Sequence, residues 1–348
     1  MNKTLWGKDK NGNDIHTYEI KNTKGMMAKV MDFGATVLEL HVLDANGQDL
    51  DVVLGYKNLE DYFTNNTYFG CCVVPFANRI GNAKFTLNGK EYAVDVNDNE
   101  NNLHSGFNPI CRRMWQLIED GENSITFQYD MEDMDSGFPG NMSMKVTYTL
   151  TEDNEFKIDY WAKSDKDTLF NPTNHSYFNL GGHDSENAMD QLVWIDADSF
   201  TETDPHSIPN GNLIKVAGTP LDFTKEKALA PEIDDEYEQL KWAAGYDHNF
   251  VLNGKEGEIK LAATMRDANS KIKMEVYTDL PGMQLYAGNY IPDKELVGKT
   301  GEKYARRSGV CFESQYFPNA INIPSFSQPV IKAGEEKETS TLYKFLIS

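Results

Sequence analysis

The sequence has few cysteines, and their spacing suggests neither a zinc ribbon nor a disulfide framework. The four cysteines stand at positions 71, 72, 111 and 311; two are adjacent, and no two form a C-x-x-C pair. We therefore expect free thiols, which fits a reducing compartment.

Long apolar runs and basic residues are also scarce. No stretch approaches the roughly 18 apolar residues of a membrane span, and residues 1–10 lack the apolar core of a signal peptide. The 33 basic residues are outnumbered by 54 acidic ones, and a net charge of −21 opposes attraction to nucleic acids and anionic membranes. We expect a cytoplasmic protein whose partners include neither nucleic acid nor membrane.

Local motifs for cofactors are missing as well. No G-x-x-x-x-G-K or G-x-G-x-x-G stands before a helix, and the seven histidines form no H-x-H or H-E-x-x-H. We interpret His16, His41, His183 and His206 as solvated or structural. The sequence therefore indicates no nucleotide cofactor and contains no local metal motif.

What the sequence does contain is alternation of apolar and polar residues along most of its 348 residues. Asn88-Gly89 between two alternating segments predicts a hairpin over residues 84–94. Two further hairpins are predicted over 144–163 and 259–278, and helical periodicity is confined to short segments at 58–63 and 234–242. The polar run 95–102 reads as an exposed turn. We predict an all-β fold, a large antiparallel β-sandwich that forms a single domain over residues 1–348.

Two polar motifs far apart in the chain could supply acid–base chemistry. His175 lies in Asn-Pro-Thr-Asn-His-Ser-Tyr-Phe-Asn-Leu-Gly-Gly, and Glu313 lies in Gly-Val-Cys-Phe-Glu-Ser-Gln-Tyr-Phe-Pro-Asn. A carboxylate can act as base and an imidazole as acid, while the guanidinium of Arg79 offers a fixed fork of donors. Sugar hydroxyls need such dense hydrogen-bonding partners. Tyr177 and Tyr286 could face the sugar or pack in the core.

The same residues leave other interpretations open. Asp247 and Gln284 occur in turn-like polar settings, where they could simply hydrogen-bond the turn. Asp247 with Glu313 could instead form the carboxylate pair of a glycoside hydrolase. His104, His175 and Glu313 could also form a two-histidine, one-carboxylate metal site.

Taken together, the motifs resemble a known family. Those that carry the resemblance occur in one order along the chain: Ala77-Asn-Arg-Ile80, Asn102-Leu-His104, Asn171 to Gly182, Asp247-His-Asn-Phe250, Gly282-Met-Gln284 and Phe312-Glu-Ser-Gln315. The chain is similar to aldose 1-epimerases, or galactose mutarotases, from about Phe33 to the C-terminus.

The resemblance implies a fold, an activity and roles for the site residues. The fold would be a β-sandwich of the galactose mutarotase-like type, and the reaction would interconvert the α and β anomers of an aldose, with galactose or glucose as the first candidates. Glu313 would be the general base and His175 the general acid, and no cofactor or metal would be needed. The sugar would be bound by Asn78, Arg79, His104, Asp247 and Gln284.

The implied chemistry opens and recloses the sugar ring. Glu313 would take the proton of the anomeric hydroxyl while His175 protonates the ring oxygen. Ordinary pKa values of about 4.3 for Glu and about 6.5 for His leave a pH window for this pair. We expect the proximity of opposite charges to widen it, by lowering the pKa of Glu313 and raising that of His175.

Two segments depart from the family's usual pattern. His104-Ser-Gly-Phe107 stands where His-Gly-Gly is usual, and Val74-Pro-Phe76 stands where Gly-Arg commonly precedes Ala-Asn-Arg-Ile. These departures bear on the local loop geometry and on the preferred sugar. The sequence fixes neither that sugar nor the oligomeric state, and a non-catalytic carbohydrate-binding sandwich remains an alternative.

Overall fold

Antiparallel hairpins are the basic unit of the fold. The computed structural model describes residues 2–186 and 188–348. All three predicted hairpins are confirmed: β8 (Lys84–Leu87) with β9 (Lys90–Ala93), β13 (Met142–Leu150) with β14 (Glu155–Ser164), and β22 (Lys260–Arg266) with β23 (Ile272–Thr278). Asn88 and Gly89 both have positive φ, of 52° and 77°, which is what a two-residue hairpin turn with the correct twist requires.

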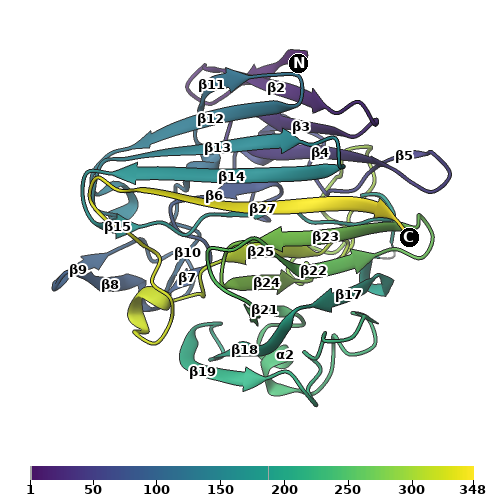
Figure 1. Cartoon of the computed structure of the whole chain (residues 1–348). Helices are drawn as coiled ribbons and strands as arrows, with labels where there is room; N and C mark the ends of the chain where they lie inside the picture. Colours follow the sequence, from purple (N-terminus) through teal and green to yellow (C-terminus); the bar gives the residue numbers. More distant parts are fainter. Residues whose placement is uncertain (1, 187) are drawn as a thin grey trace.

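The largest sheet forms the front layer of the molecule (Figure 1). Its order is β11-β12-β13-β14-β27-β23-β22-β17-β20, and every pairing is antiparallel. Along β13, buried and half-buried residues alternate, so one face is turned to the core. The strands not yet given are β11 (Gln116–Asp120), β12 (Ser124–Met131), β27 (Glu336–Ile347), β17 (Leu192–Ile195) and β20 (Lys227–Ala228).

Two five-stranded sheets form the layer behind it (Figure 1). One has the order β1-β2-β3-β4-β5 and consists of β1 (Asn2–Lys8), β2 (Asp14–Lys21), β3 (Met27–Met31), β4 (Thr36–Leu43) and β5 (Asp49–Asp51). The other has the order β19-β18-β21-β24-β25 and consists of β19 (Pro209–Lys215), β18 (Ala197–Thr203), β21 (Asp247–Leu252), β24 (Gly282–Tyr286) and β25 (Cys311–Gln315).

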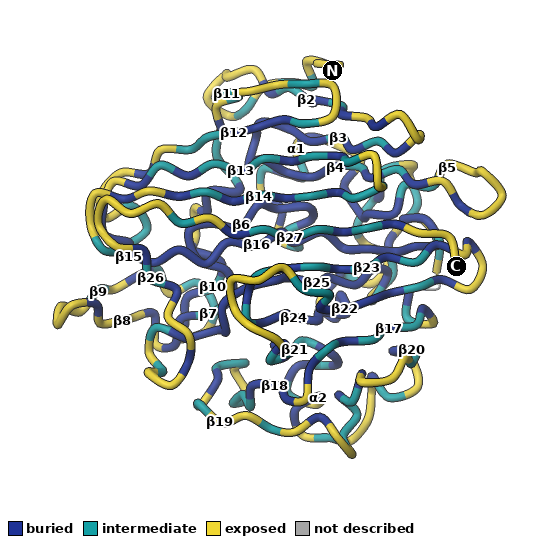
Figure 2. The backbone as a smooth tube through the Cα atoms, viewed as in Figure 1, coloured by how far each residue is buried: buried dark blue, intermediate teal, exposed yellow. Residues whose placement is uncertain are grey.

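The core lies between these layers. One continuous apolar cluster joins residues of all three sheets, among them Leu40, Val146 and Leu285. Figure 2 shows the same arrangement, with buried residues along the strands and exposed residues mainly at the outer loops and turns. The predicted all-β sandwich is therefore confirmed.

Within residues 2–186 and 188–348, short strand pairs, two short α-helices and short 3₁₀ turns complete the fold. The pairs are β6 (Cys71–Val73) with β16 (Thr173–His175), β7 (Arg79–Ile80) with β10 (Asn102–Leu103), and β15 (Thr168–Leu169) with β26 (Val330–Ile331). The predicted helical segments contain α1 (Leu59–Tyr62) and α2 (Glu238–Trp242). Within the described part of the chain, no helix combines the length and apolar character that a membrane crossing requires.

Candidate active site

One face of the sheet β21-β24-β25 presents a group of polar side chains. Gln284 is paired directly with Glu313, and Asn249 with Gln284. Paired residues on neighbouring strands share a face, as do residues two apart on one strand. Asp247, Gln284 and Glu313 therefore lie on the same face, although they are far apart in sequence.

Strand β16 brings His175 to this face. His175 pairs with Cys71 of β6, and Phe178, just beyond β16, bridges to Val310, the residue before β25. The Nε2 atom of His175 lies 3.6 Å from Oε1 of Glu313. That separation is too long for a good direct hydrogen bond, but the two groups can act on adjacent atoms of one bound molecule.

The pair β7 and β10 supplies Arg79 and His104. The backbone N–H of His104 donates to the carbonyl of Asn78 at 3.1 Å, and the N–H of Asn78 donates to Nδ1 of His104, also at 3.1 Å. The Nε of Arg79 donates to Oδ2 of Asp98 at 2.7 Å. Both side chains are thus held by contacts within this strand pair and the segment that connects its two strands.

These elements enclose one cavity of about 310 Å³. Of the residues predicted to form the site, those that line it are Asn78, Arg79, His104, His175, Asp247 and Glu313. Gln284 is buried beside them, and its Nε2 donates to Oδ1 of Asp247 at 2.6 Å. Tyr177 and Tyr286 also line the cavity, although both are almost fully buried.

Several lining residues were not predicted. Asp98 lies in the run 95–102, which the sequence suggested was an exposed turn; that prediction is wrong for Asn101 and Asn102, which are buried, and for Asp98, which lines the cavity. Tyr68 lies against both histidine rings, with centroids 4.7 Å from His104 and 5.8 Å from His175. The other unpredicted lining residues are Asn66, Thr67, Leu103 and Tyr290.

Burial dominates the protonation of the two central groups. It raises the pKa of Glu313 well above its ordinary value; the charge of Asp247 adds to the rise, and Arg79 opposes it. Burial lowers the pKa of His175 to about 4, against a hydrogen bond between the ring and its own backbone. The expected shifts were the reverse of these, so that prediction is wrong: removing both groups from water outweighs their mutual attraction.

One oxygen of Glu313 is left without a partner. Its Oε2 atom is buried, and no residue in 2–186 or 188–348 hydrogen-bonds it. An unpaired buried carboxyl oxygen is costly, and functional sites are where such exceptions occur. The atom is therefore free to hydrogen-bond a group that enters the cavity.

The contact between Asn78 and His104 bears on the metal alternative. Donor atoms of His104, His175 and Glu313 lie within 4.8 Å of one another, a spacing that could surround an ion. However, a backbone N–H can only donate, so Nδ1 of His104 must accept and the neutral ring carries its proton on Nε2. That nitrogen has no lone pair free for a metal, and the set does not fit a metal centre.

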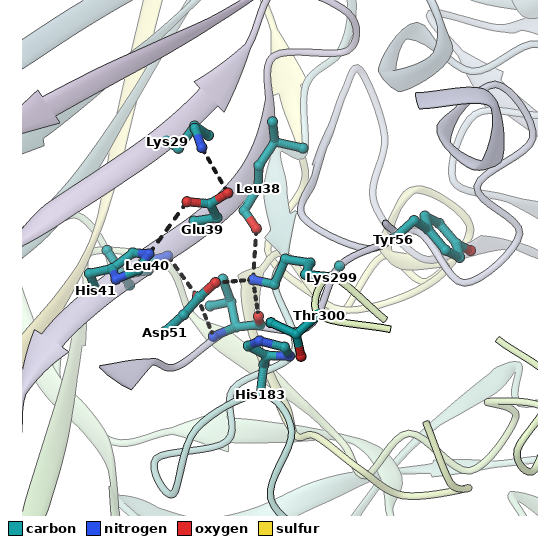
Figure 3. A network of polar contacts seen from close by, with 12 residues as sticks. Lys29, Leu38, Glu39, Leu40, His41, Asp51, Tyr56, His183, Lys299 and Thr300 are labelled. Atoms are coloured by element: carbon teal, nitrogen blue, oxygen red, sulfur yellow. Dashed lines mark hydrogen bonds and ion pairs between the residues drawn. The ribbon is translucent and has the colours of Figure 1, made fainter. Parts of the chain in front are cut away.

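A second histidine–carboxylate cluster lies elsewhere, on β4 and β5 (Figure 3). Burial raises the pKa of Glu39, but hydrogen bonds from His41 and Lys29 lower it by more, so the pKa is about 2. Burial lowers the pKa of His41, but the nearby carboxylates of Glu39 and Asp51 raise it by more, so the net pKa is raised. Lys299 forms an ion pair with Asp51. Lys29 and Lys299 of the chain itself therefore pair with Glu39 and Asp51, which agrees with a structural role for His41, one of the two roles that the sequence suggested.

The two departures from the family pattern contact each other. The hydroxyl of Ser105 accepts the N–H of Phe76 at 3.0 Å and donates to the carbonyl of the same residue at 3.0 Å. This joins the segment before Asn78 to the segment after His104. Ser105, in the departure after His104, is thus hydrogen-bonded to Phe76, in the departure before Asn78.

Comparisons with known proteins agree with this geometry. A family model described as aldose 1-epimerase matches residues 16–344. Galactose mutarotase from Mus musculus is 36% identical over 351 residues, which cover 100% of this chain and 99% of that protein. Aldose 1-epimerase from Escherichia coli (strain K12) is 34% identical and covers 96% of each chain.

Solved structures show the same similarity. An aldose epimerase homologue from C. elegans superposes with a TM-score of 0.87 at 29% identity, covering 95% of this chain and 98% of that one. Galactose 1-epimerase from Lactobacillus acidophilus NCFM gives a TM-score of 0.86 at 26% identity, covering 99% and 98%. The chain therefore belongs to the aldose 1-epimerase family of isomerases.

Proposed function

We propose that the cavity binds an aldose and interconverts its α and β anomers, with Glu313 as general base and His175 as general acid. The observation that carries this proposal is the unpartnered Oε2 of Glu313 in the same cavity as Nε2 of His175. Galactose is the first candidate substrate, because relatives are named galactose mutarotase, and glucose is the second, because aldoses differ by single hydroxyl orientations that a few loop residues can decide.

The reaction needs only proton transfers. Glu313 takes the proton of the anomeric hydroxyl, a C1 carbonyl forms, the bond from C1 to the ring oxygen breaks, and that oxygen takes a proton from His175. Rotation about C1–C2 presents the other face of the aldehyde, and reclosure returns both protons. Each group ends as it began.

The shifted pKa values fit this chemistry if the two groups are treated as one pair. With Glu313 protonated and His175 neutral, the pair holds one proton, as many as a carboxylate and an imidazolium hold together. A bound sugar would donate a hydroxyl to Oε2 and so favour the carboxylate, while its ring oxygen would accept from His175 and favour the imidazolium. Substrate binding would thereby supply a hydrogen bond to Oε2 of Glu313, which no described residue provides.

Arg79 and Asp247 would hold hydroxyls away from the reacting carbon. The charges of Asp247 and Asp98 outweigh burial and raise the pKa of Arg79, so the guanidinium stays a donor. Asp247 accepts from Gln284 through Oδ1. Asn78 would complete the pocket, and His104, whose proton lies on Nε2, would donate near the reacting end.

Polarimetry of freshly dissolved α-galactose, α-glucose and α-xylose tests the proposal. The wild-type protein should speed the approach to anomeric equilibrium with at least one sugar, and Glu313→Gln and His175→Asn should each remove about 10²- to 10⁴-fold of the acceleration. Binding without acceleration would favour a carbohydrate-binding module. Release of free sugar from glycosides would favour the hydrolase that uses Asp247 and Glu313.

A further inference from the structure

The other ring nitrogen of His175 contacts a buried cysteine. Cys311 stands two residues before Glu313 on β25, so both side chains lie on the same face. Its Sγ lies 3.5 Å from Nδ1 of His175, and the residue has no exposed surface. Thus one strand carries both the carboxyl group that faces Nε2 and the thiol that faces Nδ1.

An acid that gives up its Nε2 proton must keep the proton on Nδ1. A buried N–H group of this kind requires an acceptor. The contact of the ring with its own backbone supplies one, and the sulfur of Cys311, within the longer reach of a sulfur hydrogen bond, supplies a second. A thiol is a weak acceptor and a weak donor, so it can remain in contact while His175 changes charge. Burial, with the charges of Glu313 and Asp247, raises the pKa of Cys311; the group therefore stays a thiol.

We propose that Cys311 is a positioning residue: its sulfur accepts a hydrogen bond from Nδ1–H of His175, which keeps that proton on Nδ1 and leaves Nε2, directed at Glu313, free to lose and regain its proton. The inference rests on the proposed role of His175 as the acid.

His104 shows the opposite arrangement in the same cavity. There the backbone N–H of Asn78 donates to Nδ1, so the ring proton stays on Nε2. Nε2 of His104 is therefore always a hydrogen-bond donor. The two histidines thus hold opposite tautomers, and only His175 can take up a proton at Nε2 without losing a contact at Nδ1. The neighbour at Nδ1 decides which histidine can exchange protons with the sugar.

Cys311→Ala and Cys311→Ser test the proposal, with Cys72→Ala as the matched control. Cys72 is equally buried, but it belongs to the main apolar core, whereas Cys311 contacts the ring of His175. The ¹⁵N shifts of the His175 ring, recorded in the full-length resting protein, report the tautomer whether or not the protein proves to be an epimerase. Rates with galactose then give kcat and KM separately.

We expect Cys311→Ala to lower kcat by roughly 2- to 12-fold, the effect of one modest hydrogen bond, with KM changed by less than about twofold. Its ¹⁵N shifts should show less of the Nδ1–H tautomer, while Cys311→Ser should recover both properties in part and Cys72→Ala should alter neither. Unchanged ¹⁵N shifts in Cys311→Ala would overturn the proposal. Equal losses of kcat in all three variants would overturn it too, since they would indicate packing alone. A wild-type protein that does not accelerate anomer exchange would refute the proposed function, and the tautomer assignment would still be decided by the ¹⁵N shifts.

Discussion

Removing the carboxylate of Asp98 should lower kcat/KM, because it releases the side chain of Arg79. The Nε of Arg79 donates to Oδ2 of Asp98 at 2.7 Å, and the two side chains are only 13% and 24% exposed. Asp98→Ala takes away this charge-assisted bond and leaves the guanidinium free to change its orientation. Arg79 would then no longer be held where a sugar hydroxyl needs it.

The size of the effect follows from the lost bond. A hydrogen bond between charged partners contributes about 1.5–3 kcal/mol, and about 1.4 kcal/mol corresponds to a tenfold change. We therefore expect kcat/KM to fall about 10- to 150-fold. Asp98→Asn keeps an acceptor for the Nε–H and should lose less, because a neutral acceptor contributes about half as much as a charged one.

The pair of Arg113 and Asp135 is a matched control. Its side chains are 16% and 23% exposed, close to those of the first pair, but neither residue lines the cavity. Asp135→Ala should lower the free energy of unfolding by about 1–3 kcal/mol with little change in kcat/KM. The reasoning would be refuted if Asp98→Ala kept the wild-type kcat/KM, or if Asp135→Ala reduced it as much.

Three further predictions concern stability and pH. Lys299 is 11% exposed, pairs with Asp51, and donates to the carbonyls of Leu38 at 3.0 Å and Val53 at 2.6 Å (Figure 3). Because Lys299→Met leaves the carboxylate of Asp51 buried without its partner, it should lower the free energy of unfolding in urea by about 3–5 kcal/mol. A loss below about 1 kcal/mol would contradict this. Because the pKa of Glu313 is raised on folding, its contribution to stability declines as pH rises above the unfolded value of about 4.3. Glu313→Gln should therefore be more stable than wild type at pH 8, by about 0.5–2 kcal/mol, and an equal or lower melting temperature would argue against it. Glu313 and His175 together should hold one proton between about pH 4, the pKa of His175, and the raised pKa of Glu313. A plot of kcat/KM against pH should therefore be a broad bell, and a plot that is flat through both limbs would contradict this.

Local alternation made much of the fold predictable. The hairpin at Asn88-Gly89 and the one joining β13 to β14 end within a few residues of their predicted limits, because turn chemistry and a period of two are local signals. The order of strands across the sheets was not predictable in this way. Strand β27 pairs with β14 and β23, which lie far from it in sequence, and such pairings depend on packing of the whole chain.

The candidate site was predictable where motifs carried it. His175 and Glu313 were identified from the residues around them, and the strand register explains why they meet. Asp98 was missed because a polar loop that lines a cavity has the same composition as one that faces water. The pKa shifts were predicted with the wrong sign, since the depth at which a residue is buried is not visible in its neighbours along the chain.

Other expectations were met or stay predictions. The four cysteines are free, as expected, and the structure shows that all four are buried. The assignment of one domain and the cytoplasmic location remain predictions, as do the roles of the individual site residues.

Anomer exchange measured at equilibrium is the most direct test of the central claim. In exchange NMR, saturation of the α-anomeric proton of galactose reaches the β-anomeric proton above the spontaneous level only if the protein interconverts the two forms. The account predicts strong transfer with wild type and transfer near the spontaneous level with Glu313→Gln, at equal sugar occupancy. Equal transfer with the two proteins, or none with either at saturating galactose and glucose, would contradict it.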